Sequence, residues 1–256
     1  MMSLVYDGSW GGLLTCIFET YERKLQAVSV VRKQLYCPGF FNDCITVQAD
    51  DRKAGRVLKG LRCNLSPAGF LGFYACYLSE LPQMEEWLLA YTKLVFSLKN
   101  AECAFGNDTV LKVSQTARMV FRESHRMKGF VRFALTRDNI FYSEVEPDFN
   151  VLPLISGHFK QRFTDQQWLI YDKKRKYGIY YNLEEVTEVQ FEPPSRVPAE
   201  HSGQIFAEPE MQYQKLWKEY FVSTDIESRK NTRLQLRHMP RRYWKYLIET
   251  RDQAPE

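Results

Sequence analysis

No apolar run in the sequence approaches the roughly 20 residues that a membrane-spanning helix needs. The first residues carry no positively charged stretch ahead of an apolar run and include Asp7 and Glu19, which argues against a secretory signal. We therefore expect a cytoplasmic protein whose six cysteines remain thiols. There is no C-x-x-C pair, and Cys37 and Cys44 are too widely spaced for an ordinary zinc knuckle. The sequence predicts neither a metal site nor a cofactor.

Complete catalytic signatures are also missing. The chain has no G-x-G-x-x-G after a strand, no phosphate loop, no G-x-S-x-G elbow, no H-E-x-x-H and no three-cysteine spacing for a radical-SAM cluster. The most reactive-looking candidates are His125, Asp148 and His158, with Asn150 near them in the sequence. Such groups could bind a phosphate or move a proton, or they could simply cap helices and close turns. Whether the chain is an enzyme stays open.

Positive charge is concentrated near the carboxyl-terminal end. The formal net charge is +4, yet residues 225–245 hold seven cations against two carboxylates, so the rest of the chain sums to about −1. Cations with interleaved aromatic rings suit nucleic acid, because they neutralise phosphates while the rings stack on bases. The alternative is a solvated basic face beside core aromatics. The candidate residues in this segment are Arg229, Lys230, Arg233, Arg237, Arg241, Arg242 and Trp244.

Two further groups of cations could contribute to the same surface. Arg118, Arg122 and Arg126 recur every four residues and would share a helix face. Lys173, Lys174 and Arg175 lie in a predicted turn between two strands. The aromatic residues of those strands could form a stacking platform on the open side of a sheet or pack in the core. They are Trp168, Tyr171, Tyr177, Tyr180 and Tyr181.

Periodicity and turn residues predict an α+β protein. Residues 1–104 are expected to be mostly helical, with a short strand at 4–6 and helices after Ser9, over 49–61, after Ser66 and over 82–98. Residues 105–200 are expected to hold a helix over 107–123, a hairpin of strands 128–135 and 140–145, a short helix from Asn150 and a hairpin of strands 166–172 and 177–182. The two hairpins around the short helix predict one antiparallel sheet.

Residues 201–256 form the basic, helical last part, and we expect the three parts to make one compact unit. A helix from Glu208 and Pro209 carries a broad apolar face suited to docking. A second helix over 226–237 would align Arg229, Arg233 and Arg237, and Pro240 would end it and begin a short helix with Tyr243, Trp244 and Leu247. Residues 192–195 and their neighbours are predicted to be a loop.

Four motifs make the chain resemble a known bacterial family. They are HRMKGFVRF (125–133), EPDFNVLPLISGHFKQRF (146–163), QWLIYDKKRKYGIYY (167–181) and RKNTRLQLRHMPRRYWKYL (229–247). With the opening LVYDGSWGGLLTCIFETYERK, they resemble the domain of unknown function 4130 family, whose members are often titled "probable DNA metabolism protein". The similarity extends from about residue 4 to about residue 249.

The resemblance implies a role in DNA repair or modification, a radical-SAM partner encoded nearby, and a link to uracil-DNA glycosylase-like domains. This chain ends just after the last motif, so any base excision is expected to come from a partner protein. Phe149 stands where many relatives have His, which weakens a catalytic role at that position. We therefore predict an accessory protein in DNA repair or modification that binds single- or double-stranded DNA and acts with a radical-SAM partner. The alternatives are a module that docks an acidic partner surface and a hydrolase acting on nucleic acid.

Overall fold

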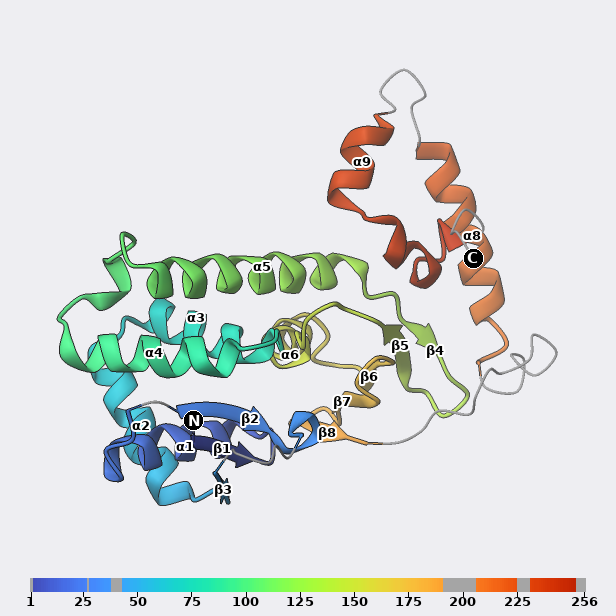
Figure 1. The fold of residues 1–256 in the computed structure, drawn as a ribbon. Coiled ribbons are helices and arrows are strands. Elements are labelled where there is room, and N and C mark those ends of the chain that lie inside the picture. The colour runs from blue at the N-terminus through green and yellow to red at the C-terminus, as the bar shows by residue number, and fades with distance from the viewer. Residues whose placement is uncertain (1, 27, 38–42, 191–205, 225–230, 252–256) are drawn as a thin grey trace. The chain divides into compact units, whose positions relative to one another are not determined.

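The computed structural model describes residues 2–26, 28–37, 43–190, 206–224 and 231–251, and it has the α+β class (Figure 1). It divides into two compact units, the first ending at Phe121 and the second beginning at Arg122. The boundary lies inside the long helix α5 (Asp108–Phe130). This division differs from the three parts expected from the sequence. Among the helices of the described residues, none combines the length and apolarity needed to cross a membrane.

The first unit consists of a small parallel sheet and the helices that pack with it. Its described strands pair in the order β2-β1-β3, both pairs parallel. The strands are β1 (Met2–Tyr6), β2 (Val28–Arg32) and β3 (Cys44–Val47). The helices are α1 (Trp10–Glu22), α2 (Asp51–Asn64), α3 (Pro67–Leu78), α4 (Met84–Ser97) and the start of α5, with single 3-10 turns at Lys33–Leu35 and Ala101–Cys103.

Local capping fixes where these helices begin, as the sequence predicted. The Ser9 hydroxyl accepts a hydrogen bond from Gly12 N at 2.9 Å, and the Ser66 hydroxyl accepts one from Gly69 N at 3.0 Å. Each bond satisfies a backbone donor that has no partner inside its helix. Prediction of a mostly helical first part was incomplete, however, because it missed β2 and β3. Within the described part of the chain, each of these short strands pairs with β1 alone, through contacts that local sequence does not reveal.

A buried polar cluster links this sheet to α4. Glu85 Oε1 accepts hydrogen bonds from the Tyr6 hydroxyl at 3.1 Å and from Arg32 Nε at 2.6 Å. Burial raises the pKa of the Tyr6 hydroxyl, and the Glu85 charge raises it further, so the hydroxyl stays protonated and donates. The carboxylate therefore fixes β1 and β2 against the first turn of α4.

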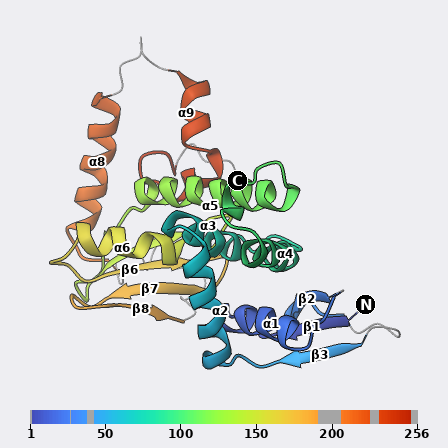
Figure 2. The same ribbon diagram turned by 90° about the vertical axis from the view of Figure 1, so that its left-hand side faces the viewer.

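The second unit contains a mixed sheet, whose described strands run in the order β4-β5-β6-β7-β8. Figure 2 shows β6, β7 and β8 side by side. They are β4 (Ala134–Leu135), β5 (Phe141–Val145), β6 (Trp168–Asp172), β7 (Tyr177–Tyr181) and β8 (Val186–Val189). The predicted hairpins β4-β5 and β6-β7 are present, but β5 and β6 are parallel. The fully antiparallel sheet was therefore a wrong prediction. Helix α6 (Leu152–Arg162) crosses over between β5 and β6, and such a crossover returns the chain in the same direction.

Helix α5 runs seven residues further than the sequence suggested, to Phe130 instead of about 123. The strand predicted from 128 was wrong over its first part, and β4 holds only Ala134 and Leu135. The reason is visible in the burial pattern. Val113, Ala117, Val120, Met127 and Val131 are all buried, at spacings of three, four or seven residues that continue one helical stripe. Val131, which was assigned to the predicted strand, is the last residue of this stripe, and its backbone N–H still bonds to the Met127 carbonyl.

The carboxyl-terminal elements of the second unit are α8 (Glu210–Thr224), the seven-residue helix α9 (Thr232–His238) and a 3-10 helix, η5 (Arg241–Tyr246). Their order matches the prediction, including the break at Pro240. The loop predicted at 192–195 and the helix start at Ile226 lie outside the described residues.

Candidate nucleic-acid interface

Helix α9 presents two of the predicted arginines. Asn231 caps it by accepting a hydrogen bond from Leu234 N at 3.0 Å, and Arg233 and Arg237 follow on its exposed surface, four residues apart. Arg229 and Lys230 lie outside the described residues. Arg126 Nη2 donates to the Arg237 carbonyl at 3.1 Å, which brings α9 against the last part of α5. Cations from these two elements are therefore neighbours.

The α5 row is mostly open to solvent. Arg118, in the first unit, and Arg122, in the second, are exposed, whereas Arg126 is half-buried against α9. Within the described residues, the side chains of Arg118, Arg122, Arg233 and Arg237 have no ion-pair partner. A guanidinium with no carboxylate neighbour keeps its donors available for an external anion. We name Arg122, Arg233 and Arg237, the exposed arginines without an ion-pair partner on these two elements of the second unit, the α5–α9 cation cluster.

Arg242 is exposed, but two carboxylates of the protein engage its guanidinium group. Its Nη2 lies 2.6 Å from Asp148 Oδ2 and 3.4 Å from Glu123 Oε2. Glu123 is buried and also accepts hydrogen bonds from the Tyr243 hydroxyl and from Asp148 N. Burial lowers the pKa of Arg242, but its bonds to Tyr243 and the charges of Asp148 and Glu123 outweigh this and raise it overall. The arginine balances a buried carboxylate, which limits its use for an outside ligand.

The turn at 173–176 also uses its cations internally. Arg175 binds Asp172 at 2.9 Å and donates to the carbonyls of Pro147 and Asp148 at 3.1 and 2.9 Å. Lys174 Nζ donates to the same Asp148 carbonyl at 3.0 Å, and Lys173 pairs with Glu144 at 3.0 Å. These contacts hold the 147–148 loop. Their evident role is structural.

The predicted stacking aromatics are mostly inside the unit. Tyr243 and Trp244 are buried, with Trp244 Nε1 donating to the Met239 carbonyl at 2.9 Å and Arg241 stacked over its ring at 5.9 Å. Of the strand aromatics, only Tyr180 is half-exposed, and its hydroxyl donates to Gln167 Oε1 at 3.0 Å. Of the two alternatives for these strand aromatics, the structure supports packing in the core, because Trp168, Tyr171, Tyr177 and Tyr181 are buried.

The candidate catalytic residues do not form a constellation. Within the described residues, no hydrogen bond or ion pair joins any two of His125, Asp148 and His158, and Asp148 pairs with Arg242. Partial burial lowers the pKa of His158, as do the charges of Lys128 and Arg162, so this imidazole is neutral near pH 7. Asn150 accepts a hydrogen bond from the Tyr177 hydroxyl. Among the residues that the structure describes, no group of three His, Cys, Asp or Glu could hold a metal ion.

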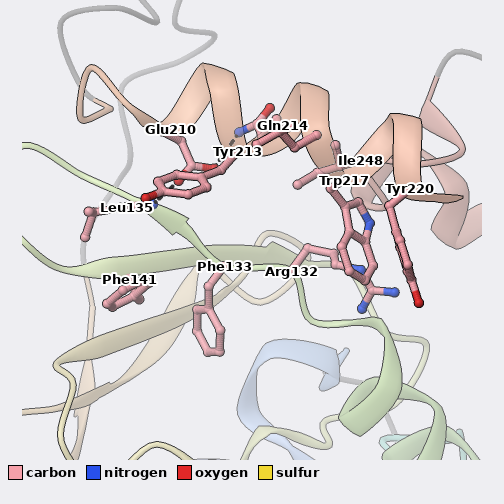
Figure 3. A pocket seen from close by; sticks show the side chains of 11 residues that line it. Arg132, Phe133, Leu135, Phe141, Glu210, Tyr213, Gln214, Trp217, Tyr220 and Ile248 are labelled. Atoms are coloured by element: carbon pink, nitrogen blue, oxygen red, sulfur yellow. Dashed lines mark hydrogen bonds between the residues drawn. The ribbon is translucent and has the colours of Figure 1, made fainter.

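The structure adds a groove that the sequence did not reveal. It has a volume of about 970 Å³ and lies along α8, β4 and β5 in the second unit (Figure 3). Its apolar walls are Phe133, Phe141, Tyr213, Leu216, Trp217 and Tyr220, and polar groups come from Arg132, Glu210 and Gln214. The signal was the apolar face of the helix after Pro209. The sequence predicted that this apolar face docks against another surface. In the structure it is largely open, because Tyr213, Leu216 and Tyr220 are 64%, 59% and 60% exposed.

Together these features define an α+β protein whose second unit carries both an exposed cation cluster and an aromatic groove. The sequence model of the family described as "Domain of unknown function (DUF4130)" matches residues 82–249, and the chain belongs to this family. No curated protein and no solved structure gives a significant match. The matched region includes all of the second unit's described strands and the groove.

Proposed function

We propose that this protein binds nucleic acid as an accessory factor in DNA repair or modification, in the cytoplasm and beside a radical-SAM partner. The observation that carries the binding proposal is the α5–α9 cation cluster, three exposed arginines without carboxylate partners among the described residues. The DNA context and the partner rest on the resemblance of the four motifs to a family titled for DNA metabolism.

The cluster is suited to phosphates for two reasons. Guanidinium groups bind phosphate oxygens through paired N–H donors, and they stay charged at any physiological pH. Two of the three arginines are one helical turn apart on α9, and the Arg126–Arg237 bond holds α9 against the carboxyl-terminal part of α5. Release of counterions from the nucleic acid would then drive association.

The test is DNA binding across a salt series with nuclease-treated protein. Fluorescent single- and double-stranded oligonucleotides are titrated with the native chain and with an Arg122→Ala, Arg233→Ala, Arg237→Ala variant. The affinity falls as salt rises, so the slope of log affinity against log salt is negative. If all three arginines contact duplex phosphates, their loss makes this slope shallower by about 3. A Lys59→Ala, Lys99→Ala, Lys112→Ala variant is the control, because it removes the same charge from exposed positions in the first unit.

Equal slopes for the two variants would contradict a role of the cluster. If the native chain fails to bind either oligonucleotide at low salt, the nucleic-acid proposal itself is wrong. The basic surface would then fit the second candidate, docking to an acidic protein. Co-purification of such a partner would survive nuclease treatment and would be lost in the arginine variant.

A further inference from the structure

An exposed tryptophan in the groove is held in a fixed orientation by buried polar groups. Trp217 is 41% exposed, yet its Nε1 donates to Glu249 Oε2 at 3.0 Å. The Glu249 side chain is only 3% exposed, and Arg132 Nη2 donates to its other oxygen at 2.7 Å. The Arg132 guanidinium also lies 5.8 Å from the centre of the Trp217 ring. Burying a carboxylate is costly. Here that carboxylate orients a side chain that faces solvent.

Two tyrosines extend this aromatic surface along α8. Tyr213, Trp217 and Tyr220 are spaced four and three residues apart, which places them on one face of the helix. The Trp217 and Tyr220 ring centres are 5.9 Å apart, with their planes tilted by 36°. In Figure 3 Trp217 and Tyr220 point from α8 toward the side of the groove that holds Arg132, and the Tyr213 ring points toward Leu135. The result is a row of three aromatic side chains that are 64%, 41% and 60% exposed.

We propose that this row stacks the unpaired bases of a single-stranded nucleic acid, an inference that rests on the proposed function and names its substrate class. Every base has a π-face, and exposed aromatic side chains are what single-strand binders use to hold successive bases. In a duplex those faces are covered by neighbouring base pairs. A row of rings on an open groove therefore selects single strands, loops or flipped nucleotides.

Charge favours a nucleic acid over an apolar peptide as the occupant. Arg132, in the groove, follows Arg126 by six residues, so their Cα atoms are at most about 20 Å apart. Arg126 in turn binds α9, which carries Arg233 and Arg237. A strand of a few nucleotides can therefore place phosphates at the α5–α9 cation cluster and bases in the groove. The unpaired guanidinium groups of the cluster complement the phosphates and offer nothing to an apolar helix.

The decisive variant keeps the groove apolar and removes two ring faces. Tyr213→Leu with Tyr220→Leu leaves large hydrophobic side chains, and none of the hydrogen bonds within the described residues involves either hydroxyl. The probe is a single-stranded oligonucleotide with an internal 2-aminopurine, a base whose fluorescence falls on stacking, and its duplex. The native chain is expected to quench the probe and to bind the single strand at least tenfold more tightly than the duplex. The double variant is expected to bind the single strand about tenfold more weakly, with little quenching and unchanged duplex affinity.

Two controls separate this inference from the proposed function. Met211→Ala with Val222→Ala removes exposed apolar groups of α8 that do not line the groove, and it should bind like the native chain. Glu249→Gln loosens the Trp217 anchor without removing a ring, and it should reduce quenching. If the leucine variant binds and quenches like the native chain while the arginine variant loses both DNA forms, the groove proposal is wrong and the proposed function stands. Absence of DNA binding by the native chain overturns both.

Discussion

At the scale of single residues, Glu249 makes stability depend on pH. Burial raises the pKa of this carboxyl, but hydrogen bonds from Arg132 and Trp217 and the charge of Arg132 lower it more, so its folded pKa is below the ordinary value. A carboxyl with a lowered folded pKa stabilises the protein above its unfolded pKa of about 4.3 and loses that contribution as the pH falls through the folded pKa. Acid should therefore weaken the Trp217 anchor.

We predict that the free energy of unfolding falls more steeply below about pH 4.3 in the native chain than in Glu249→Gln, which has no group to protonate there. Urea unfolding at a series of pH values measures both curves. At neutral pH the variant should be less stable by about 1–3 kcal/mol, because Arg132 loses a charged partner. Glu208→Gln, at an exposed position, is the control and should follow the native curve. Parallel curves for the native chain and Glu249→Gln would refute this account.

At the scale of elements, the sequence predicted what local chemistry decides. Ser9 and Ser66 marked helix starts, and the KKRK turn marked the β6-β7 hairpin, because caps and turns depend on neighbours in the chain. Strands β2, β3 and β8 were missed, and the parallel β5-β6 pair was read as antiparallel. The parallel pairs form between segments separated by a helix or a longer stretch of chain, and β8 is a short edge strand with little buried surface. Their sequences alone carry a weak signal.

Strand β7 has a position that only glycine fits. A Cβ on Gly178 would lie 2.9 Å from the Ile170 carbonyl oxygen and 3.1 Å from Leu169 Cδ1, both on the paired strand β6. Backbone cannot move away cheaply, so Gly178→Ala should destabilise the protein by about 1–3 kcal/mol. Gly157→Ala in α6 meets nothing within 4 Å and should instead stabilise it by about 0.5–1 kcal/mol. Denaturant midpoints would give both values, and equal effects would argue against the close approach of β6 and β7.

At the scale of the whole molecule, the candidate site combines what sequence could and could not supply. Charge clustering pointed to Arg122, Arg233 and Arg237, because surface cations are readable from composition. It could not separate them from Arg242, whose carboxylate partner Asp148 is distant in the sequence and is brought to it by the fold. The groove could not be predicted from the sequence either, because residues distant in the chain form it. Trp217 is anchored by Glu249, which lies 32 residues later in the chain.

Each unit has its own sheet and its own buried core, so we predict that a local defect lowers protection in one unit only. Gly12→Ala is the defect in the first unit, because its Cβ would collide with the Asp7 carboxylate and approach Tyr6 Cδ2 to 2.9 Å. Gly178→Ala is its counterpart in the second. Amide hydrogen exchange followed by mass spectrometry should show faster exchange in β1 and α1 for the first variant and in β6 and β7 for the second. The α5 helix spans the boundary, so its two halves should respond to different variants. If either substitution accelerates exchange equally throughout the chain, the units unfold together and the division at Phe121 has no energetic meaning.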